Sequence, residues 1–323
     1  MKTPTRPPRG GNPPNRPHGD RPRSDRPAGD RPRGDRPYAP RPAGDRPRTD
    51  APRPRPEGGR REWRENRPAP LVLKAAPREA ESERDLLRIA GLPAVAALMA
   101  RSPQRVERLF YEERHREAAG PWCKLLAAAR KPYRMLGREE LDRVAGSKLH
   151  GGIVAIARPK AIPAFDPAAA VAEAGKRRLL LILDGIGNAN NLGAIARSAA
   201  FLGIDRIVLS SDPRQALPTD AAYRVAEGGL EHVLVMRTPD LAAALAAIAP
   251  AYLTVAAVAS GGSDPAKLPH DRPVALVLGN EETGLSEATI AACAAKATIA
   301  GGGALDSLNV SVAAGILMHA LRR

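Results

Sequence analysis

The segment Arg178-Leu-Leu-Leu-Ile-Leu-Asp184 is the most informative part of this chain about its architecture. Its unbroken apolar run is typical of a strand that is buried on both faces of a sheet. Further apolar strands are predicted at 206–210, 253–259 and 274–278. Helices are predicted at 192–202, 241–249, 290–295 and 310–321. Apolar strands that alternate with helices indicate an α/β unit whose parallel sheet is covered by helices on both faces.

A smaller α/β unit is predicted upstream, over residues 71–158. The segment 84–101 has helical spacing after Pro93, further helices are predicted at 121–130 and 139–144, and strands are predicted at 105–112 and 153–157. Residues 159–175 have the composition of a linker. The larger unit is therefore expected to begin at about 176 and to continue to 323.

Residues 1–70 have a different chemistry. They repeat Asp-Arg-Pro every five residues from Asp20 to Pro37, and again at Asp45-Arg46-Pro47. Proline at this density forbids helix and sheet, and few apolar side chains are present to offset the ordering entropy. We predict a disordered basic tail, which carries about ten charges of the chain's net +15. Such a tail suits a polyanionic partner such as RNA, DNA or an anionic membrane, and a solubilising tether fits the composition equally well.

The composition also argues against several classes of protein. Cys123 and Cys293 lie far apart, and the sequence contains no Cys/His cluster, so no metal site is implied. The N-terminus lacks the apolar region of a secretory signal. The apolar runs are too short or too interrupted to span a bilayer. We therefore expect a cytoplasmic protein without a membrane-spanning segment.

Polar residues follow the predicted strands, where ligands bind in open parallel sheets. The loop after Asp184 ends in Asn188-Ala-Asn-Asn191 and leads into the helix that carries Arg197. It lacks the third glycine and the acidic residue of a dinucleotide-binding fold, which argues against a nicotinamide dehydrogenase. The asparagines suit a helix N-cap. Arg197 stands in an otherwise Ala/Ile/Leu helix, either as a surface residue or as a functional one.

The loop after the strand 274–278 has a similar character. Gly279 ends the strand without a side chain, which allows a flat ligand to approach the backbone. Glu281 and Glu282 follow it. They can serve as an acid or a base, or they can favour the N-terminus of the next helix, and the helix-terminal interpretation is stronger for Glu282.

A third polar loop precedes the last predicted helix. Gly301-Gly-Gly303 leads into Ser307, Asn309 and Ser311. Asp306 or Ser307 can cap the helix, but one cap does not explain Ser307, Asn309 and Ser311 together. The sequence shows no nucleophile and base in a recognisable pairing, so chemistry that depends on a covalent intermediate is not indicated.

In this order and spacing, the three loops resemble the motifs of the SpoU/TrmH family of RNA ribose 2′-O-methyltransferases, part of the SPOUT class. The matching segments are Asn191–Arg197, Leu278–Ser286 and Ile299–Ser311. The resemblance covers about 176–323. It continues more weakly upstream, where Ile89–Leu98 and Leu149–Ala155 resemble the ribosomal-protein-like substrate-binding domain of many members.

The resemblance implies a deep trefoil knot in the C-terminal domain, a homodimer, and S-adenosylmethionine as the methyl donor. Arg197 matches the position that is implicated in activating the ribose 2′-hydroxyl. The positions that match cofactor contacts are Gly279, Ile299 and Leu308. The positions that match the other active-site polar residues are Asn191, Glu281, Ser307 and Asn309.

The sequence departs from the family pattern at two places. Ile299-Ala-Gly301 replaces the usual Ile-Pro-Met, and Asn188-Ala-Asn190 replaces the Asp-Pro that usually precedes the first motif's Asn. The first change affects the expected cofactor loop more than the chemistry. The main hypothesis is therefore 2′-O-methylation of rRNA or tRNA, with rRNA favoured by the upstream domain. The alternative is a non-catalytic RNA-binding or ribosome-assembly factor on a SPOUT scaffold.

Overall fold

The computed structural model describes residues 85–176, 179–269 and 271–322. They belong to one compact unit, Ala75–Arg323. The predicted basic tail and the first residues of the predicted upstream unit lie outside the described residues. Within the described ranges, no helix is both long and apolar enough to cross a bilayer.

The upstream part of this unit combines helices with a sheet, as predicted, but the sheet has four strands where two were predicted. Its strands, in the spatial order β1-β4-β2-β3, are β1 (Leu87–Ala90), β4 (Ile153–Ala157), β2 (Val106–Tyr111) and β3 (Tyr133–Met135). Its helices are α1 (Leu92–Arg101), α2 (Arg116–Ala128) and α3 (Arg138–Ala145), with 3₁₀ turns η2 (Pro103–Arg105) and η3 (Glu113–His115).

The helical spacing predicted after Pro93 is confirmed by α1, but the residues before it contain a strand that was not predicted. Leu87–Ala90 is a strand that pairs antiparallel with β4. Gly91, with a φ of 94°, turns the chain after this strand, and Pro93 lies in the first turn of α1. A strand of four residues, whose partner β4 comes more than 60 positions later in the chain, has too short a pattern to be distinguished from the adjoining helix.

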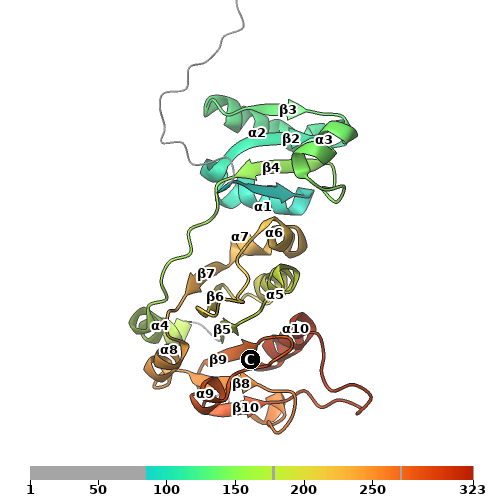
Figure 1. Cartoon of the computed structure of the whole chain (residues 1–323). Coiled ribbons are helices and arrows are strands. Elements are labelled where there is room, and N and C mark those ends of the chain that lie inside the picture. Colours follow the sequence, from blue (N-terminus) through green and yellow to red (C-terminus); the bar gives the residue numbers. More distant parts are fainter. Residues whose placement is uncertain (1–84, 177–178, 270, 323) are drawn as a thin grey trace, which may run out of the picture. The chain divides into compact units, whose positions relative to one another are not determined.

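The second sheet confirms the predicted parallel architecture (Figure 1). Its six strands pair in the order β10-β8-β9-β5-β6-β7, and every pairing is parallel. The strands are β5 (Leu179–Asp184), β6 (Arg206–Leu209), β7 (Leu234–Arg237), β8 (Leu253–Ala257), β9 (Val274–Gly279) and β10 (Ala295–Ala297).

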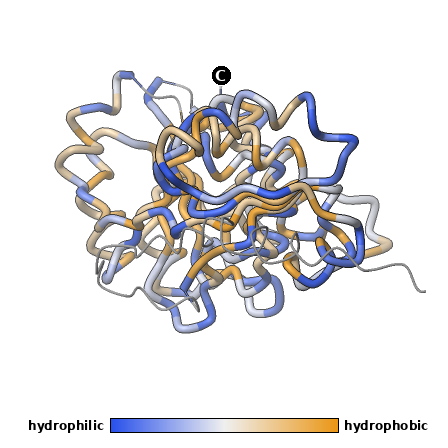
Figure 2. The backbone as a smooth tube through the Cα atoms, turned by 90° about the horizontal axis from the view of Figure 1, so that it is seen from above, coloured by the Kyte–Doolittle hydropathy of each residue, from blue (hydrophilic) through white to orange (hydrophobic). Residues whose placement is uncertain are grey.

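Helices cover both faces of this sheet. Successive side chains of β5 point alternately to one face and to the other. Leu181 and Leu183 pack with the core that includes α5 and α10. Leu180 and Ile182 pack with the core that includes α4 and α8. Figure 2 shows the apolar residues concentrated along the central strands, with hydrophilic residues on the outer turns. The helices are α4 (Pro167–Glu173), α5 (Ala189–Phe201), α6 (Asp220–Ala226), α7 (Gly229–His232), α8 (Leu241–Ile248), α9 (Glu287–Ala291) and α10 (Val310–Leu321), with 3₁₀ turns η4 (Ala174–Lys176) and η5 (Pro265–Lys267).

Several short elements differ from the prediction. The helix predicted at 290–295 ends at Ala291, and residues 295–297 form the edge strand β10 instead. The predicted linker contains α4, whose Ala170 packs in the same core as Leu245 of α8. The strand β7 was not predicted, because its four residues gain their order from pairing with β6.

A buried ion pair joins the upstream sheet to the larger one. The Arg105 guanidinium lies 2.6 Å from a Glu231 carboxylate oxygen, with side-chain exposures of 11% and 1%. Arg105 also donates to the Tyr223 hydroxyl at 3.2 Å. Close packing accompanies this pair, because a Cβ on Gly228 would lie only 2.8 Å from the Cβ of Ala97. The two sheets are therefore joined by a charge pair that is largely shielded from water.

We expect Glu231→Gln to lower the free energy of unfolding by about 3–5 kcal/mol, because it leaves the Arg105 charge buried without a counter-charge. Denaturant-induced unfolding followed by circular dichroism measures the change. Arg88→Ala is the matched control, since Arg88 pairs with Asp220 at 3.6 Å with its side chain half exposed. Its loss should cost about 0–1 kcal/mol. Equal effects of the two substitutions would contradict the role given to the buried pair.

Candidate active site

The ends of strands β5 and β9 bring two of the predicted loops together. These strands pair in register, so that Asp184 and Gly279 are opposite each other at the carboxyl edge of the sheet. The loop 185–188 continues from β5 into α5, and the loop 280–286 continues from β9 into α9. Asn280 links them, because its side-chain amide donates to the Gly185 carbonyl at 2.7 Å.

Three of the predicted site residues form a hydrogen-bonded chain across all three loops. The Asn191 amide nitrogen donates to Glu281 Oε1 at 2.8 Å. The Asn309 amide nitrogen donates to Asn191 Oδ1 at 3.2 Å. Residues that are 118 positions apart in the sequence thus share one polar cluster. The sequence analysis named all three, and the structure brings them together.

The carboxylate fixes the direction of this chain. An ionised carboxylate only accepts hydrogen bonds, so Asn191 must turn its NH₂ toward Glu281 and its carbonyl oxygen toward Asn309. Asn309 then donates with its NH₂, while its Oδ1 accepts from the Ser311 backbone N–H at 2.9 Å. Each amide nitrogen has a second hydrogen that it can offer to a ligand.

Asn309 therefore caps the last helix. The prediction that Asp306 or Ser307 is the cap is wrong. Its Oδ1 accepts from both the backbone and the hydroxyl of Ser311, the second residue of α10. The first helix of the site starts in a similar way, since Asn188 accepts from the Asn190 backbone N–H at 2.8 Å, as the asparagine-rich loop predicts. Both helix starts depend on short amides, because these reach back to the orphan N–H groups of the first turn.

The electrostatics of Glu281 decide what it can do. Partial burial raises the pKa of its carboxyl group, but hydrogen bonds from the Asn191 amide and from the backbone N–H groups of Glu281, Gly187 and Asn188 outweigh burial and lower the pKa overall. The Gly187 N–H lies 3.2 Å from Glu281 Oε2. Glu281 is thus ionised at neutral pH, and a carboxylate with a lowered pKa is a weak base. The site uses it to orient Asn191.

Gly279 is required by the chain's own backbone. A Cβ at this position would lie 2.5 Å from both the Gly284 carbonyl carbon and the Leu285 nitrogen. The loop 280–284 folds back tightly, because Asn280 and Gly284 exchange two backbone hydrogen bonds at 3.1 and 2.9 Å. Gly284 has a φ of 68°, which favours glycine. Any larger residue at Gly279 would push this loop, and Glu281 with it, away from Asn191.

Arg197 does not join the polar cluster within one chain. It lies six residues after Asn191 on α5, with a side chain that is 56% exposed. Its guanidinium lies 2.8 Å from the carboxylate of Glu227, at the end of α6. The helix α7 passes close to it, since a Cβ on Gly229 would lie 2.7 Å from the Arg197 Cα. No motif or periodicity in the sequence predicts that Glu227, at the end of α6, contacts Arg197.

The remaining predicted residues lie on the segment between β10 and α10. Ile299 is half buried and packs against the main core. Ser307 is exposed, and Leu308 is exposed to 47%. Leu305 in the same loop is exposed to 81%, which leaves two apolar side chains of this loop open to a ligand or a partner.

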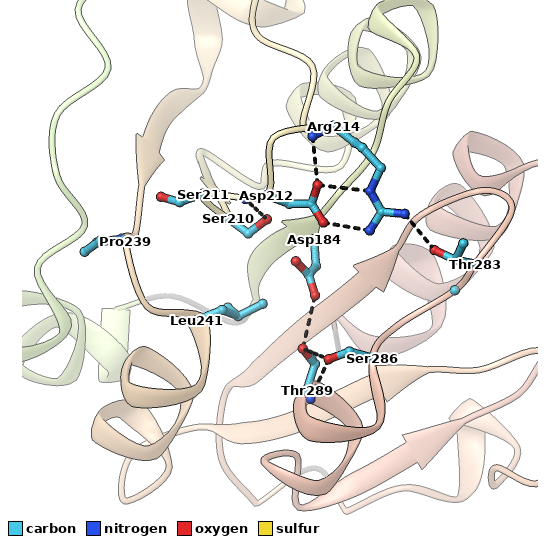
Figure 3. A pocket seen from close by; sticks show the side chains of 11 residues that line it. Asp184, Ser210, Ser211, Asp212, Arg214, Pro239, Leu241, Thr283, Ser286 and Thr289 are labelled. Carbon is cyan, nitrogen blue, oxygen red and sulfur yellow. Dashed lines mark hydrogen bonds and ion pairs between the residues drawn. The ribbon is translucent and has the colours of Figure 1, made fainter.

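A separate polar cavity of about 590 Å³ lies beyond β5, β6 and β7 (Figure 3). Gly279, Ile299 and Leu308 are not among the residues that line it. The Arg214 guanidinium donates two hydrogen bonds to the Asp212 carboxylate and lowers the pKa of Asp212 to about 2. Arg214 also donates to the Thr283 hydroxyl at 3.1 Å. These bonds tie the loop after β6 to the loop that carries Glu281.

Gln215 is a supporting residue that the sequence analysis missed. Its buried side-chain amide accepts from the Ile186 N–H at 3.1 Å and donates to the Ile186 carbonyl at 3.3 Å. It therefore holds the loop that leads to Asn191. Gln215 stands outside every motif in a loop between β6 and α6, so its role follows only from the three-dimensional arrangement.

Comparison with known proteins agrees with these motifs. Residues 178–319 match the SpoU rRNA Methylase family, and residues 88–163 match the RNA 2′-O ribose methyltransferase substrate-binding family. The chain is 33% identical over 234 residues to the 23S rRNA (guanosine-2′-O-)-methyltransferase RlmB of Acinetobacter baylyi, covering 71% of this chain and 94% of that protein. It is also 33% identical over 259 residues to human mitochondrial rRNA methyltransferase 1, covering 71% of this chain and 70% of that protein.

Solved structures share the fold. The AdoMet-bound rRNA methyltransferase of Sinorhizobium meliloti matches with a TM-score of 0.62 and 22% identity, over 75% of this chain and 88% of that chain. The SpoU methyltransferase AviRb of Streptomyces viridochromogenes matches with a TM-score of 0.57 and 21% identity, over 74% of this chain and 90% of that chain. With the motifs in place at one edge of the parallel sheet, the chain belongs to the SpoU rRNA methylase family.

Proposed function

We propose that this protein methylates a ribose 2′-oxygen of ribosomal RNA, with S-adenosylmethionine as the methyl donor. The observation that carries the proposal is the hydrogen-bonded chain of Glu281, Asn191 and Asn309, which joins the three family motifs. Similarity to methyltransferases that act on 23S rRNA guanosine supports the choice of substrate. An enzyme that modifies ribosomal RNA would work in the cytoplasm.

The segments expected to hold the cofactor have suitable chemistry. Ile299 and Leu308 offer apolar surface for an adenine ring, and the exposed Leu305 adds more in the same loop. Gly301, Gly302 and Gly303 have open space where a Cβ would stand, so this loop has room to close. Gly279 contributes backbone at the end of β9. When bound, S-adenosylmethionine supplies a methyl group on a sulfonium, which is already a strong methyl donor.

Arg197 is assigned to the RNA phosphate beside the target ribose. The 2′-hydroxyl must lose its proton as the methyl group arrives. A guanidinium has a pKa above about 12, so it does not act as a base, but it grips a phosphate with two hydrogen bonds and favours the developing charge on the neighbouring oxygen. Asn191 and Asn309 then position the ribose with their second amide hydrogens. Ser307, two residues before Asn309, offers a hydroxyl for a further hydrogen bond to the ribose.

Two further family features are proposed for this chain. The first is a deep trefoil knot formed by the loops of the C-terminal domain. The second is a homodimer. Val312 and Ile316 lie one turn apart on α10 and are exposed to 51% and 42%, which gives a second copy an apolar stripe to cover.

Arg197→Ala should lower the rate of methyl transfer by about 100- to 1,000-fold while the affinity for S-adenosylmethionine is retained, because the substitution removes a charge that acts on the RNA. Transfer of a labelled methyl group to an rRNA transcript measures the rate, and calorimetry measures cofactor affinity. Arg272→Ala is the control, since Arg272 precedes β9 at the opposite edge of the sheet. Unchanged turnover in Arg197→Ala would refute the role of Arg197.

The same calorimetry tests the alternative of a non-catalytic RNA-binding factor. A parent protein that binds RNA but takes up no S-adenosylmethionine at millimolar concentration would support that alternative and contradict the proposed reaction. Mapping 2′-O-methyl sites on rRNA and tRNA with and without the gene identifies the natural substrate. Unaltered methylation of every RNA in the deletion strain would also contradict the proposal.

Glu281→Gln should lower the melting temperature at pH 7, and the difference from the parent should shrink as the pH falls below 4.5. The pKa of Glu281 is lowered from its ordinary value of 4.5 in the folded protein. Its charged form therefore adds stability above that value, which is lost as the pH falls through the lowered pKa. Thermal unfolding at several pH values measures this. Glu282→Gln is the neighbouring control, and an identical pH dependence for both variants would argue against the proposed cluster.

Val312→Asp combined with Ile316→Asp should convert a dimer to a monomer, because the new charges would have to be buried in the contact. Light scattering after gel filtration gives the molar mass. Leu125→Asp on α2 is the control, with a similar exposure of 47%. A dimer that survives both α10 substitutions would place the subunit contact elsewhere.

A further inference from the structure

A groove of about 510 Å³ is lined in part by Arg197. One wall is formed by small residues of α1, including Ala97 and Ala100. The other wall is formed by α5 and α7, with Arg197, Phe201 and His232. The α1 wall comes from the part of the chain that matches the substrate-binding family, and the other wall from the methylase part.

Phe201 gives this groove an unusual surface. Its side chain is 88% exposed, the highest value among the large apolar side chains that are exposed in the described part of the chain. The protein is poor in aromatic residues, with three phenylalanines in 323 residues. The aliphatic core neighbours of Phe201 on α5, such as Ile195 and Ala199, are fully buried. An aromatic ring held in water beside an arginine is the combination that stacks on an unpaired base and holds its phosphate.

The spacing of Arg197 and Phe201 suits such a ligand. They are four residues apart on α5, so their side chains lie on the same face, separated by about 6 Å along the helix axis. One side chain presents a cation and the next presents a flat apolar ring. A single nucleotide has the complementary pair of groups, which are an anionic phosphate and a flat base.

Glu227 holds the guanidinium at the edge of the groove. It ends α6 with a φ of 44°, a conformation that is uncommon for residues other than glycine. This places its carboxylate 2.8 Å from Arg197 Nη2, with both side chains about half exposed. A phosphate that approaches Arg197 must compete with this carboxylate, and in water such an exposed pair is weak.

We propose that this groove receives an unpaired RNA nucleotide that flanks the target, with its base stacked on Phe201 and its phosphate replacing Glu227 at Arg197. The inference rests on the proposed function, because it assumes that RNA is the substrate. It adds that the RNA is recognised with a base out of its helix, since a base within a duplex cannot reach the ring. Until RNA binds, the Glu227 carboxylate takes the place of the phosphate at Arg197.

The test measures the affinity of the full chain for a single-stranded RNA oligonucleotide and for a duplex of the same sequence, by fluorescence anisotropy. Phe201→Ala should weaken single-strand binding by roughly 5- to 150-fold, the range for loss of one stacked base, and should leave duplex binding unchanged. Phe201→Trp should preserve affinity, and Phe201→Leu should not, because leucine keeps the apolar surface but lacks the ring. Glu227→Gln should strengthen single-strand binding several-fold.

A spectroscopic signal separates stacking from a structural effect. The tryptophan of the Phe201→Trp variant should lose fluorescence when single-stranded RNA binds, beyond any change in the parent, which has two tryptophans. Leu125→Ala is the matched control, because Leu125 is 47% exposed on α2 and is not among the residues that line the groove. This control should bind both RNAs as the parent does.

Two results would overturn the inference and leave the proposed function standing. One is methyl transfer and single-strand affinity in Phe201→Ala equal to those of the parent, while Arg197→Ala is impaired. The other is a changed molar mass in Phe201→Ala with unchanged RNA affinity, which would make Phe201 a subunit contact. Failure of the parent itself to bind RNA or transfer a methyl group would instead overturn the proposed function.

Discussion

Six strands that run in one direction constrain everything else in the larger part of this protein. Parallel pairing sends every connection back across a face of the sheet, so each loop that leaves a strand does so at the same edge. Asp184 and Gly279 are therefore neighbours although 95 positions separate them. The loops after β5, β9 and β10 leave the sheet at this edge, and Asn191, Glu281 and Asn309 meet there. Both faces of the sheet are apolar and packed by helices.

The hydrogen bonds of the polar cluster fix the orientation of the side chains that meet there. A single carboxylate at one end determines how two asparagine amides are turned, and the last amide determines where α10 begins. Gln215 and Asn280 brace the same loops through backbone groups of Ile186 and Gly185. The geometry thus depends on few charges and many fixed dipoles, which is an arrangement that needs little reorganisation when a ligand arrives.

The elements with strong local patterns could be predicted from the sequence, and those stabilised by distant partners could not. The five-residue apolar run of β5 is enough to predict a buried strand. In contrast, β1 and β10 are stabilised by pairing with β4 and β8, which the local sequence does not show. In the site, the meeting of Asn191, Glu281 and Asn309 was foreseeable from the rule on parallel strands. The partner of Arg197 was not, because Glu227 reaches it through a left-handed residue at the end of a helix that no pattern marked.

Asn309 has two structural roles. Its amide nitrogen donates to Asn191 in the polar cluster, and its amide oxygen caps α10. If the loop before it swings open, the Ser311 N–H loses its acceptor, and the first turn of the helix is left to fray. Loop opening and helix fraying are therefore one event seen from two places. Amide hydrogen exchange at Ser311 would report on the openness of the loop, even in a protein whose loop residues give no signal of their own.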